Sequence, residues 1–237
     1  MTRAKSTGRP RARPARPVRQ TAHRALLAVP FAFDYLLQLP PGYASRRRWP
    51  LLVFLHGRGE RGADLRRIKR HGLPKLIASG RRFPFIVVSP QCPDLEPWWN
   101  LTALDTFVTA IMRRYRVDSR RVYLTGLSMG GYGTWALATR HPERFAAILP
   151  ICGGGEPRLA RRLRRLPIWA FHGAQDQTVP LVRSRAMVRA IRAAGGTPRF
   201  TIYPEAVHDS WTQTYARDDI YTWLLSHRLP PRPAPRR

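Results

Sequence analysis

The stretch YLTGLSMGGYG, residues 123–133, decides the fold expected for this chain. It contains the pentapeptide GLSMG between an apolar run that ends at Leu124 and a small-residue stretch that can continue as a helix. Glycines on both sides of a serine let a strand reverse into a helix without Cβ clashes, and such a turn exposes the hydroxyl. The pattern predicts that Ser128 is a nucleophile for acyl transfer, with a glycine-rich structural turn as the alternative.

Two downstream loops supply candidate partners for this serine. The apolar run LPIWAF, residues 166–171, leads into HGAQD, which ends at Asp176, and the run FTIY, residues 200–203, leads into His208. Each side chain stands just past a predicted strand, where parallel strands bring distant loops to one edge. We expect neutral His208 to take the Ser128 proton while Asp176 holds the other ring nitrogen. A helix-capping aspartate and a loop histidine are the alternative.

Other acids flank the candidate base. Glu205 and Asp209 are close to His208 in the sequence, but residues so near on one chain rarely point at the same ring. We therefore prefer Asp176. The developing oxyanion also needs two N–H donors, and we expect one from Met129, directly after the nucleophile. The second is expected from Arg58 in the loop HGRGERG, residues 56–62, after a predicted central strand.

Several motifs resemble those of one enzyme group. They are LLVFLHGRGERG, VVSPQCP, the pair Trp98-Trp99, RVYLTGLSMGGYGTWALA, HPERFAAILPICGGG, WAFHGAQDQTVP and YPEAVHDSW. Between about residues 33 and 225 the chain is similar to α/β-hydrolases of the small carboxylesterase and dienelactone hydrolase-like group. One departure is Val207, where relatives often carry glycine before the histidine.

The resemblance implies an α/β-hydrolase fold, with a mostly parallel central sheet and helices on both faces. Carried over by position, it implies a Ser128, His208 and Asp176 triad with Arg58 and Met129 as backbone oxyanion donors. The apolar runs predict the strands independently, at 34–39, 51–55, 84–89, 121–125, 146–151, 167–171 and 199–203. Residues 152–165 leave room for one helix, so we expect no large lid.

Length and composition fit one domain. The chain has 237 residues and 43% hydrophobic residues, and we predict a hydrolase domain over 25–228. Residues 1–24 and 229–237 are rich in arginine and proline and are predicted to be disordered tails. A basic stretch before 25–33 superficially resembles a secretory signal, but Pro30 interrupts it, so a cytoplasmic location is expected. We expect no membrane span, and the sequence does not indicate the oligomeric state.

The net charge of +28 raises the question of nucleic-acid binding. Residues 1–24 hold eight arginine or lysine residues and no acid, and 228–237 hold four more. The remaining positive charge is spread along the chain without a recognisable nucleic-acid motif, so no specific nucleic-acid partner is expected. The partner we expect is a small-molecule ester.

The remaining polar residues indicate no cofactor and no metal. Cys92 and Cys152 follow predicted strands without metal or redox spacing, and reduced burial is expected unless the chain is exported. The histidines outside the triad are given structural or solvent roles; they are His56, His71, His141, His172 and His227. Trp98 and Trp99 are expected either to wall the substrate pocket or to pack in the core.

These patterns predict a cofactor-independent serine esterase that acts through an acyl-enzyme on short-chain or water-soluble acyl groups. Two alternatives remain open at this point. One is a small serine peptidase of the prolyl oligopeptidase-like type with the same triad. The other is a noncatalytic basic binding protein on a hydrolase scaffold.

Overall fold

A computed structural model of the chain describes residues 20–26, 31–45 and 47–231. The predicted tails therefore lie largely outside the described residues, as do 27–30. Within the described residues, none of the helices combines the length and the apolar character needed to span a bilayer.

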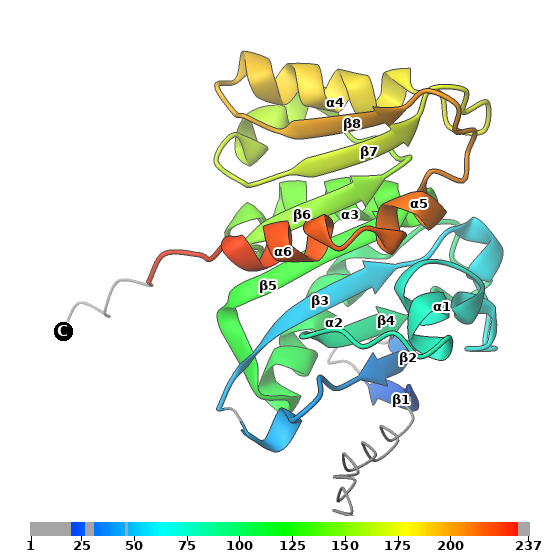
Figure 1. Cartoon of the computed structure of the whole chain (residues 1–237), viewed down its shortest axis with the longest axis vertical. Coiled ribbons are helices and arrows are strands. Elements are labelled where there is room, and N and C mark those ends of the chain that lie inside the picture. Colours follow the sequence, from blue (N-terminus) through cyan, green and yellow to red (C-terminus); the bar gives the residue numbers. More distant parts are fainter. Residues whose placement is uncertain (1–19, 27–30, 46, 232–237) are drawn as a thin grey trace, which may run out of the picture.

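One eight-stranded sheet organises the molecule (Figure 1). Its spatial order is β1-β2-β4-β3-β5-β6-β7-β8, with antiparallel pairing of β1 with β2 and of β2 with β4, and parallel pairing from β4 to β8. The strands are β1 (Thr21–Leu26), β2 (Ala32–Gln38), β3 (Trp49–Leu55), β4 (Ile86–Pro90), β5 (Val117–Leu127), β6 (Ala147–Ile151), β7 (Trp169–Gly173) and β8 (Arg199–Tyr203). The α/β-hydrolase fold class predicted from the sequence is confirmed.

The central strands are apolar along their whole length because helices cover both of their faces. Every residue of β3, β4, β6 and β7 is buried. Continuous apolar runs are typical of parallel strands covered on both sides, and these are the runs from which the strands were predicted.

The first strand corrects the predicted domain boundary. Residues 21–24 were placed in a disordered tail, whereas they form β1 along the edge of the sheet, in register with β2 from Thr21 opposite Leu37 to Leu26 opposite Ala32. The segment TAHRAL has no apolar run, so its composition gave no sign of a strand. An edge strand is held mainly by backbone hydrogen bonds, which almost any sequence can make. The disorder predicted for 1–19 stays a prediction.

Six α-helices among the described residues form two layers. Helices α2 (Leu101–Arg114), α3 (Met129–Arg140) and α4 (Val182–Ala193) contribute to one apolar cluster, and α1 (Gly72–Ala78), α5 (Trp211–Ala216) and α6 (Asp219–Ser226) contribute to another. In Figure 1, α5 and α6 cross in front of the sheet while α2 and α3 lie behind it. Two separate cores on opposite faces hold the strands between them. Because β3, β5, β7 and β8 run in the same direction, the loops that follow them emerge at one edge of the sheet.

Short 3-10 helices complete the connections: η1 (Tyr43–Ser45), η2 (Arg58–Glu60), η3 (Arg67–Arg70), η4 (Pro142–Arg144) and η5 (Pro157–Leu163). The last of these occupies the segment 152–165, where a lid would stand. This single short helix agrees with the expectation that no large lid is present there.

Candidate active site

Ser128 occupies a sharp turn between β5 and α3. Its backbone has φ 52° and ψ −117°, a conformation that costs free energy for a residue with a Cβ. The turn brings two backbones into close contact, since a Cβ on Gly130 would lie 2.0 Å from the carbonyl oxygen of Leu55, and one on Gly126 would lie 2.4 Å from the carbonyl oxygen of Gly130. Only glycine fits at these two positions, and for this reason the pattern G-x-S-x-G predicts the turn.

The structure brings Ser128, His208 and Asp176 into one hydrogen-bonded line. Nε2 of His208 lies 2.9 Å from Oγ of Ser128, and Nδ1 of His208 lies 2.8 Å from Oδ2 of Asp176. His208 comes from the loop after β8 and Asp176 from the loop after β7, so three loops on one edge meet here. The aspartate side chain is fully buried, whereas the imidazole is 21% exposed.

Backbone donors fix the other oxygen of the same carboxylate. The N–H groups of Thr178 and Val179 donate to Oδ1 of Asp176 at 2.9 and 2.8 Å. Because one oxygen is held by two backbone N–H groups, the other is directed towards His208. The two competing acids are placed otherwise: Asp209 bonds to the backbone and hydroxyl of Thr212, and Glu205 accepts from Gln175.

A second histidine, His172, contacts the carboxylate of Asp176. Its Nε2 lies 3.2 Å from Oδ2 and its side chain is fully buried at the end of β7. Burial lowers the pKa of His172, which opposes a charge on the ring. The sequence gave this histidine only a structural or solvent role. Its place four residues before Asp176 was the available signal, but spacing alone does not tell which way a side chain points.

The loop after β3 passes close to Ser128. A Cβ on Gly57 would lie 3.7 Å from Cβ of Ser128, and the N–H of Gly57 donates to Oε2 of Glu60 at 2.8 Å. Arg58 follows in η2. On the other side of the serine, the N–H of Met129 begins α3, and the first N–H groups of a helix have no acceptor within it. The two backbone groups predicted as oxyanion donors thus belong to the segments that flank Ser128.

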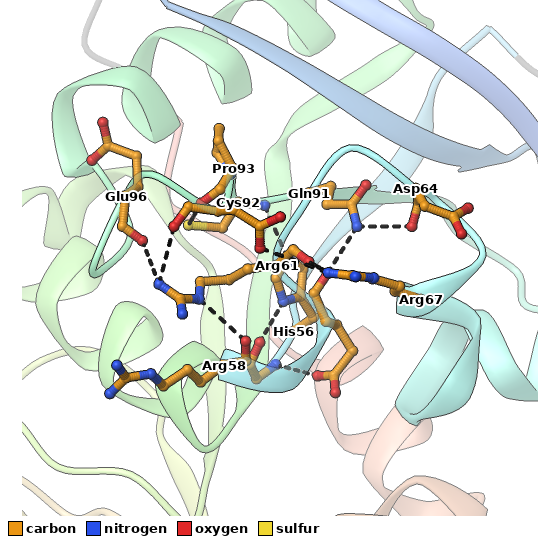
Figure 2. A network of polar contacts seen from close by, with 12 residues as sticks. His56, Arg58, Arg61, Asp64, Arg67, Gln91, Cys92, Pro93 and Glu96 are labelled. Carbon is orange, nitrogen blue, oxygen red and sulfur yellow. Dashed lines mark hydrogen bonds and ion pairs between the residues drawn. The ribbon is translucent and has the colours of Figure 1, made fainter.

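Polar contacts tie this loop to the loop after β4 (Figure 2). The guanidinium of Arg61 donates to the carbonyl oxygens of Arg58 and Glu96 at 3.2 and 2.8 Å. Gln91 donates to the carbonyl oxygens of Glu60 and Asp64. The loop that contains Arg58 is therefore fixed by hydrogen bonds to the segment that follows β4 as well as by its connection to β3.

His56 is the buried centre of the same network (Figure 2). Its Nδ1–H donates to the carbonyl oxygen of Gly57 at 2.6 Å, and its Nε2 accepts the N–H of Cys92 at 2.9 Å. One donor and one acceptor fit a neutral ring, and burial lowers the pKa of His56 to about 4. The sequence analysis assigned a structural or solvent role, and the structure specifies it as the link between the loops after β3 and β4.

A cavity of about 720 Å³ begins at Tyr132, one helical turn after Ser128. Its apolar walls include Trp98, Trp99, Leu101, Tyr132 and Leu159, and it is also lined by Arg140, Arg162 and Arg183. Trp98 is 53% exposed and packs edge-on against Tyr132, while Trp99 is 5% exposed and packs against His56. Both tryptophans line the cavity, and Trp99 also belongs to the core, so the two alternatives predicted for the pair are not exclusive.

Both cysteines are buried and free. Sγ of Cys152 accepts the backbone N–H of Ser128 at 3.3 Å, and burial raises the pKa of this thiol. Cys152, Asp176 and His208 also form a group whose possible ligand atoms lie within 4.8 Å of one another. Because Asp176 and His208 are already bonded to each other, this group is part of the site described above, and the expectation of no metal stays a prediction.

Comparison with known proteins identifies the family. The profile of the dienelactone hydrolase family matches residues 100–220, which make up half of the chain and include Ser128, Asp176 and His208. This chain belongs to the dienelactone hydrolase family. Membership agrees with the resemblance drawn from the motifs, and the match includes β5, the turn and α3.

Individual relatives of this dienelactone hydrolase family member are esterases by name. A bifunctional acetylxylan esterase/xylanase of Neocallimastix patriciarum is 24% identical over 184 residues, covering 73% of this chain and 26% of the relative. A solved thermostable esterase is 32% identical with a TM-score of 0.77, covering 88% of this chain and 63% of that protein. A solved ferulic acid esterase, 20% identical with a TM-score of 0.66 over 88% of this chain and 96% of its own, shows the fold alone.

This family member thus spans about a quarter of the length of the acetylxylan esterase/xylanase and less than two thirds of the thermostable esterase.

Proposed function

We propose that this chain is a serine hydrolase that cleaves carboxylic esters through an acyl-enzyme. The observation that carries the proposal is the line of hydrogen bonds from Ser128 Oγ through His208 to the buried carboxylate of Asp176. A serine hydroxyl becomes a usable nucleophile when a neutral imidazole can accept its proton, and a carboxylate on the far nitrogen keeps that imidazole in the required tautomer. Membership of the dienelactone hydrolase family supports the same chemistry.

The proposed reaction has two halves. In the first, Oγ of Ser128 attacks the ester carbonyl carbon while Nε2 of His208 takes the hydroxyl proton, and the carbonyl oxygen becomes an oxyanion held by the N–H groups of Arg58 and Met129. The C–O bond to the alcohol then breaks, and the imidazolium returns its proton to the departing alkoxide. Asp176 stabilises the imidazolium and stays ionised throughout.

In the second half, water replaces the alcohol. His208 takes a proton from the water as its oxygen attacks the acyl carbon, and the tetrahedral intermediate collapses by breaking the bond to Ser128 Oγ, which recovers the proton from the imidazolium. The products are an alcohol and a carboxylic acid, and the reaction needs no cofactor.

The surroundings of the site bear on the substrate. Within the described segment 152–165 the helical structure is the short η5, which supports short-chain or water-soluble esters. The cavity beside Tyr132 is of the size that holds small organic ligands, and we propose that it receives the larger of the two groups joined by the ester bond.

The test is turnover of p-nitrophenyl acetate by the wild type and by Ser128→Ala. We expect the variant to lose at least about 10³-fold in kcat, with Ser79→Ala, a change at an exposed serine, unaffected. Turnover by Ser128→Ala at the wild-type rate would exclude the proposal. A dipeptide anilide assayed alongside measures amide cleavage, and a faster rate on the anilide would favour a peptidase.

A further inference from the structure

The carboxylate of Asp176 serves two imidazoles at the same oxygen. Oδ2 lies 2.8 Å from Nδ1 of His208 and 3.2 Å from Nε2 of His172. The first ring faces Ser128 and is partly exposed, whereas the second lies in the interior at the end of β7, just before the loop that carries Asp176. The proposed mechanism uses His208 and leaves His172 without a role.

The partners of His172 determine where its proton lies. Its Nε2 is 2.8 Å from the carbonyl oxygen of Val179, which can only accept a hydrogen bond, so Nε2 carries a hydrogen. The carboxylate oxygen of Asp176 is also only an acceptor while it is ionised. The Nε2–H therefore bonds to the carbonyl of Val179, and Oδ2 of Asp176 is a second and longer acceptor, 3.2 Å from the same nitrogen.

The other ring nitrogen is held from α4. Nδ1 of His172 lies 2.8 Å from Oγ of Ser184, and that hydroxyl also lies 2.8 Å from the carbonyl oxygen of Gly153, to which it donates. Both Ser184 and the imidazole are buried to 1% exposure or less. The ring is thus fixed at both nitrogens, by Ser184 of α4 and by Val179 of the loop after β7, and the loop after β6 holds the hydroxyl of Ser184 in turn.

Four donors then surround one carboxylate. Oδ1 of Asp176 accepts from the N–H groups of Thr178 and Val179, and Oδ2 accepts from His208 at 2.8 Å and has Nε2 of His172 at 3.2 Å. Two of these donors are backbone N–H groups of the loop after β7, the third is the buried ring of His172, and only His208 moves a proton in the proposed reaction. The direction of the bond to His208 is therefore set by groups that do not take part in the chemistry.

Other titratable groups face this arrangement from three elements. Tyr132 of α3 is close enough to Asp176 for the carboxylate to add to the rise that burial causes in the pKa of Tyr132, and Asp209, next to His208, acts in the same way on Cys152. Cys152 approaches Asp176 and His208 from the loop after β6, with its thiol bonded to the N–H of Ser128. Trp211 of α5 packs edge-on against His208 and separates it from His71, which itself faces Glu60 at 3.8 Å.

We propose that His172 is a positioning residue for this site, an inference that rests on the proposed function. Its Nε2–H holds Oδ2 of Asp176 in line with His208 and partly neutralises the negative charge on that oxygen. Removing the donor has two consequences. The carboxylate is less well aligned, so kcat falls. The oxygen that loses a partner also binds the imidazolium of His208 more strongly, so the acid limb of the pH profile moves to higher pH.

A pair of variants separates this role from a general loss of packing. His172→Met is similar in reach and has no N–H, whereas His172→Gln can place an amide N–H close to the position of Nε2. We expect His172→Met to lose about 10- to 100-fold in kcat with KM within about twofold, as for loss of a hydrogen bond to a charged group. Its acid-side midpoint for kcat/KM is expected to rise by about half a unit or more.

His172→Gln is expected to recover most of kcat and the wild-type midpoint. The inference is overturned if His172→Met keeps the kcat and the midpoint of the wild type, or if the glutamine variant is no better than the methionine variant. A purely structural histidine would instead lower the melting temperature of both variants and leave the pH profile of the folded protein unchanged.

A measurement on the unmodified protein covers the case in which the methionine variant does not fold. In the wild type with 15N-labelled histidine, a long-range 1H–15N spectrum should show His172 protonated at Nε2, and protonation at Nδ1 alone would overturn the inference. This spectrum does not depend on turnover. An inactive wild type with His172 protonated at Nε2 would therefore refute the proposed esterase while the donor to Asp176 stands.

Discussion

The most informative single substitution is Asp176→Asn, because the structure determines which way the new amide must face. Oδ1 of Asp176 accepts two backbone N–H groups, from Thr178 and Val179. Those donors cannot change, whereas His208 can move its ring hydrogen and the Nε2–H of His172 keeps the carbonyl of Val179 as its acceptor. The asparagine oxygen therefore keeps the position of Oδ1, and its NH2 group faces His208. An NH2 group is only a donor, which forces Nδ1 of His208 to accept and moves the ring hydrogen to Nε2, opposite Ser128 Oγ. An imidazole protonated there cannot accept the hydroxyl proton.

The expected loss is about 10⁴-fold in kcat, the size found when the aspartate of a known serine hydrolase triad is changed to asparagine, or about 5.5 kcal/mol in the barrier. The assay is p-nitrophenyl acetate hydrolysis between about pH 6 and pH 9, with thermal melts to check that the variant is folded. Asp209→Asn is the matched control, since the carboxylate of Asp209 bonds to Thr212 and does not contact the imidazole. Asp176→Asn with activity within tenfold of the wild type, or Asp209→Asn with an equal loss, would refute this reasoning.

Three further predictions follow from the supports of the site. Burial lowers the pKa of His56 in the folded protein from 6.5 to about 4, so the unfolded chain binds a proton first as the pH falls. The neutral buried ring therefore contributes roughly 3 kcal/mol to the free energy of unfolding above pH 6.5, and this contribution is lost as the pH falls towards 4. Urea unfolding at pH 7 and pH 5 should show a smaller pH dependence of stability in His56→Gln than in the wild type. Gly130→Ala is expected to prevent stable folding, because its Cβ would lie 2.0 Å from the Leu55 carbonyl oxygen. Gly59→Ala is the control, since a Cβ there has nothing within 4 Å, and it should melt like the wild type. Equal melting temperatures for the two variants would contradict the close approach at Gly130. Arg61→Met is expected to lower kcat about 10- to 100-fold with little change in KM, because the guanidinium that joins the carbonyl oxygen of Arg58 to that of Glu96 is lost. Steady-state kinetics showing a change in KM alone would argue against this role.

The sequence was most informative where the geometry restricts residue choice. Only glycine fits at Gly126 and Gly130, so the turn that carries Ser128 leaves a readable pattern. The fully buried strands β3 and β4 leave continuous apolar runs for a similar reason. Asp176 and His208 could be proposed because each follows such a run, and the connections of a parallel sheet bring those ends together.

What the sequence did not indicate is held by contacts that leave no local pattern. Strand β1 is joined to β2 through backbone groups, so its polar residues were taken for a tail. The orientations of His56 and His172 depend on partners such as Cys92, Val179 and Ser184, whose approach is a result of the whole fold. A histidine at the end of an apolar strand has the same sequence context whether its ring faces solvent, a carbonyl group or a carboxylate.

The central claim is that Ser128 is the nucleophile activated by His208, and covalent labelling tests it most directly. A fluorophosphonate reacts with an activated serine and leaves a phosphonyl group on its oxygen, which intact-mass measurement and peptide mapping can locate. The account predicts one label per chain, on Ser128, with loss of ester hydrolysis in proportion to labelling and no labelling of His208→Ala. A fully active enzyme that takes no label, or a label on another residue that abolishes activity, would contradict it.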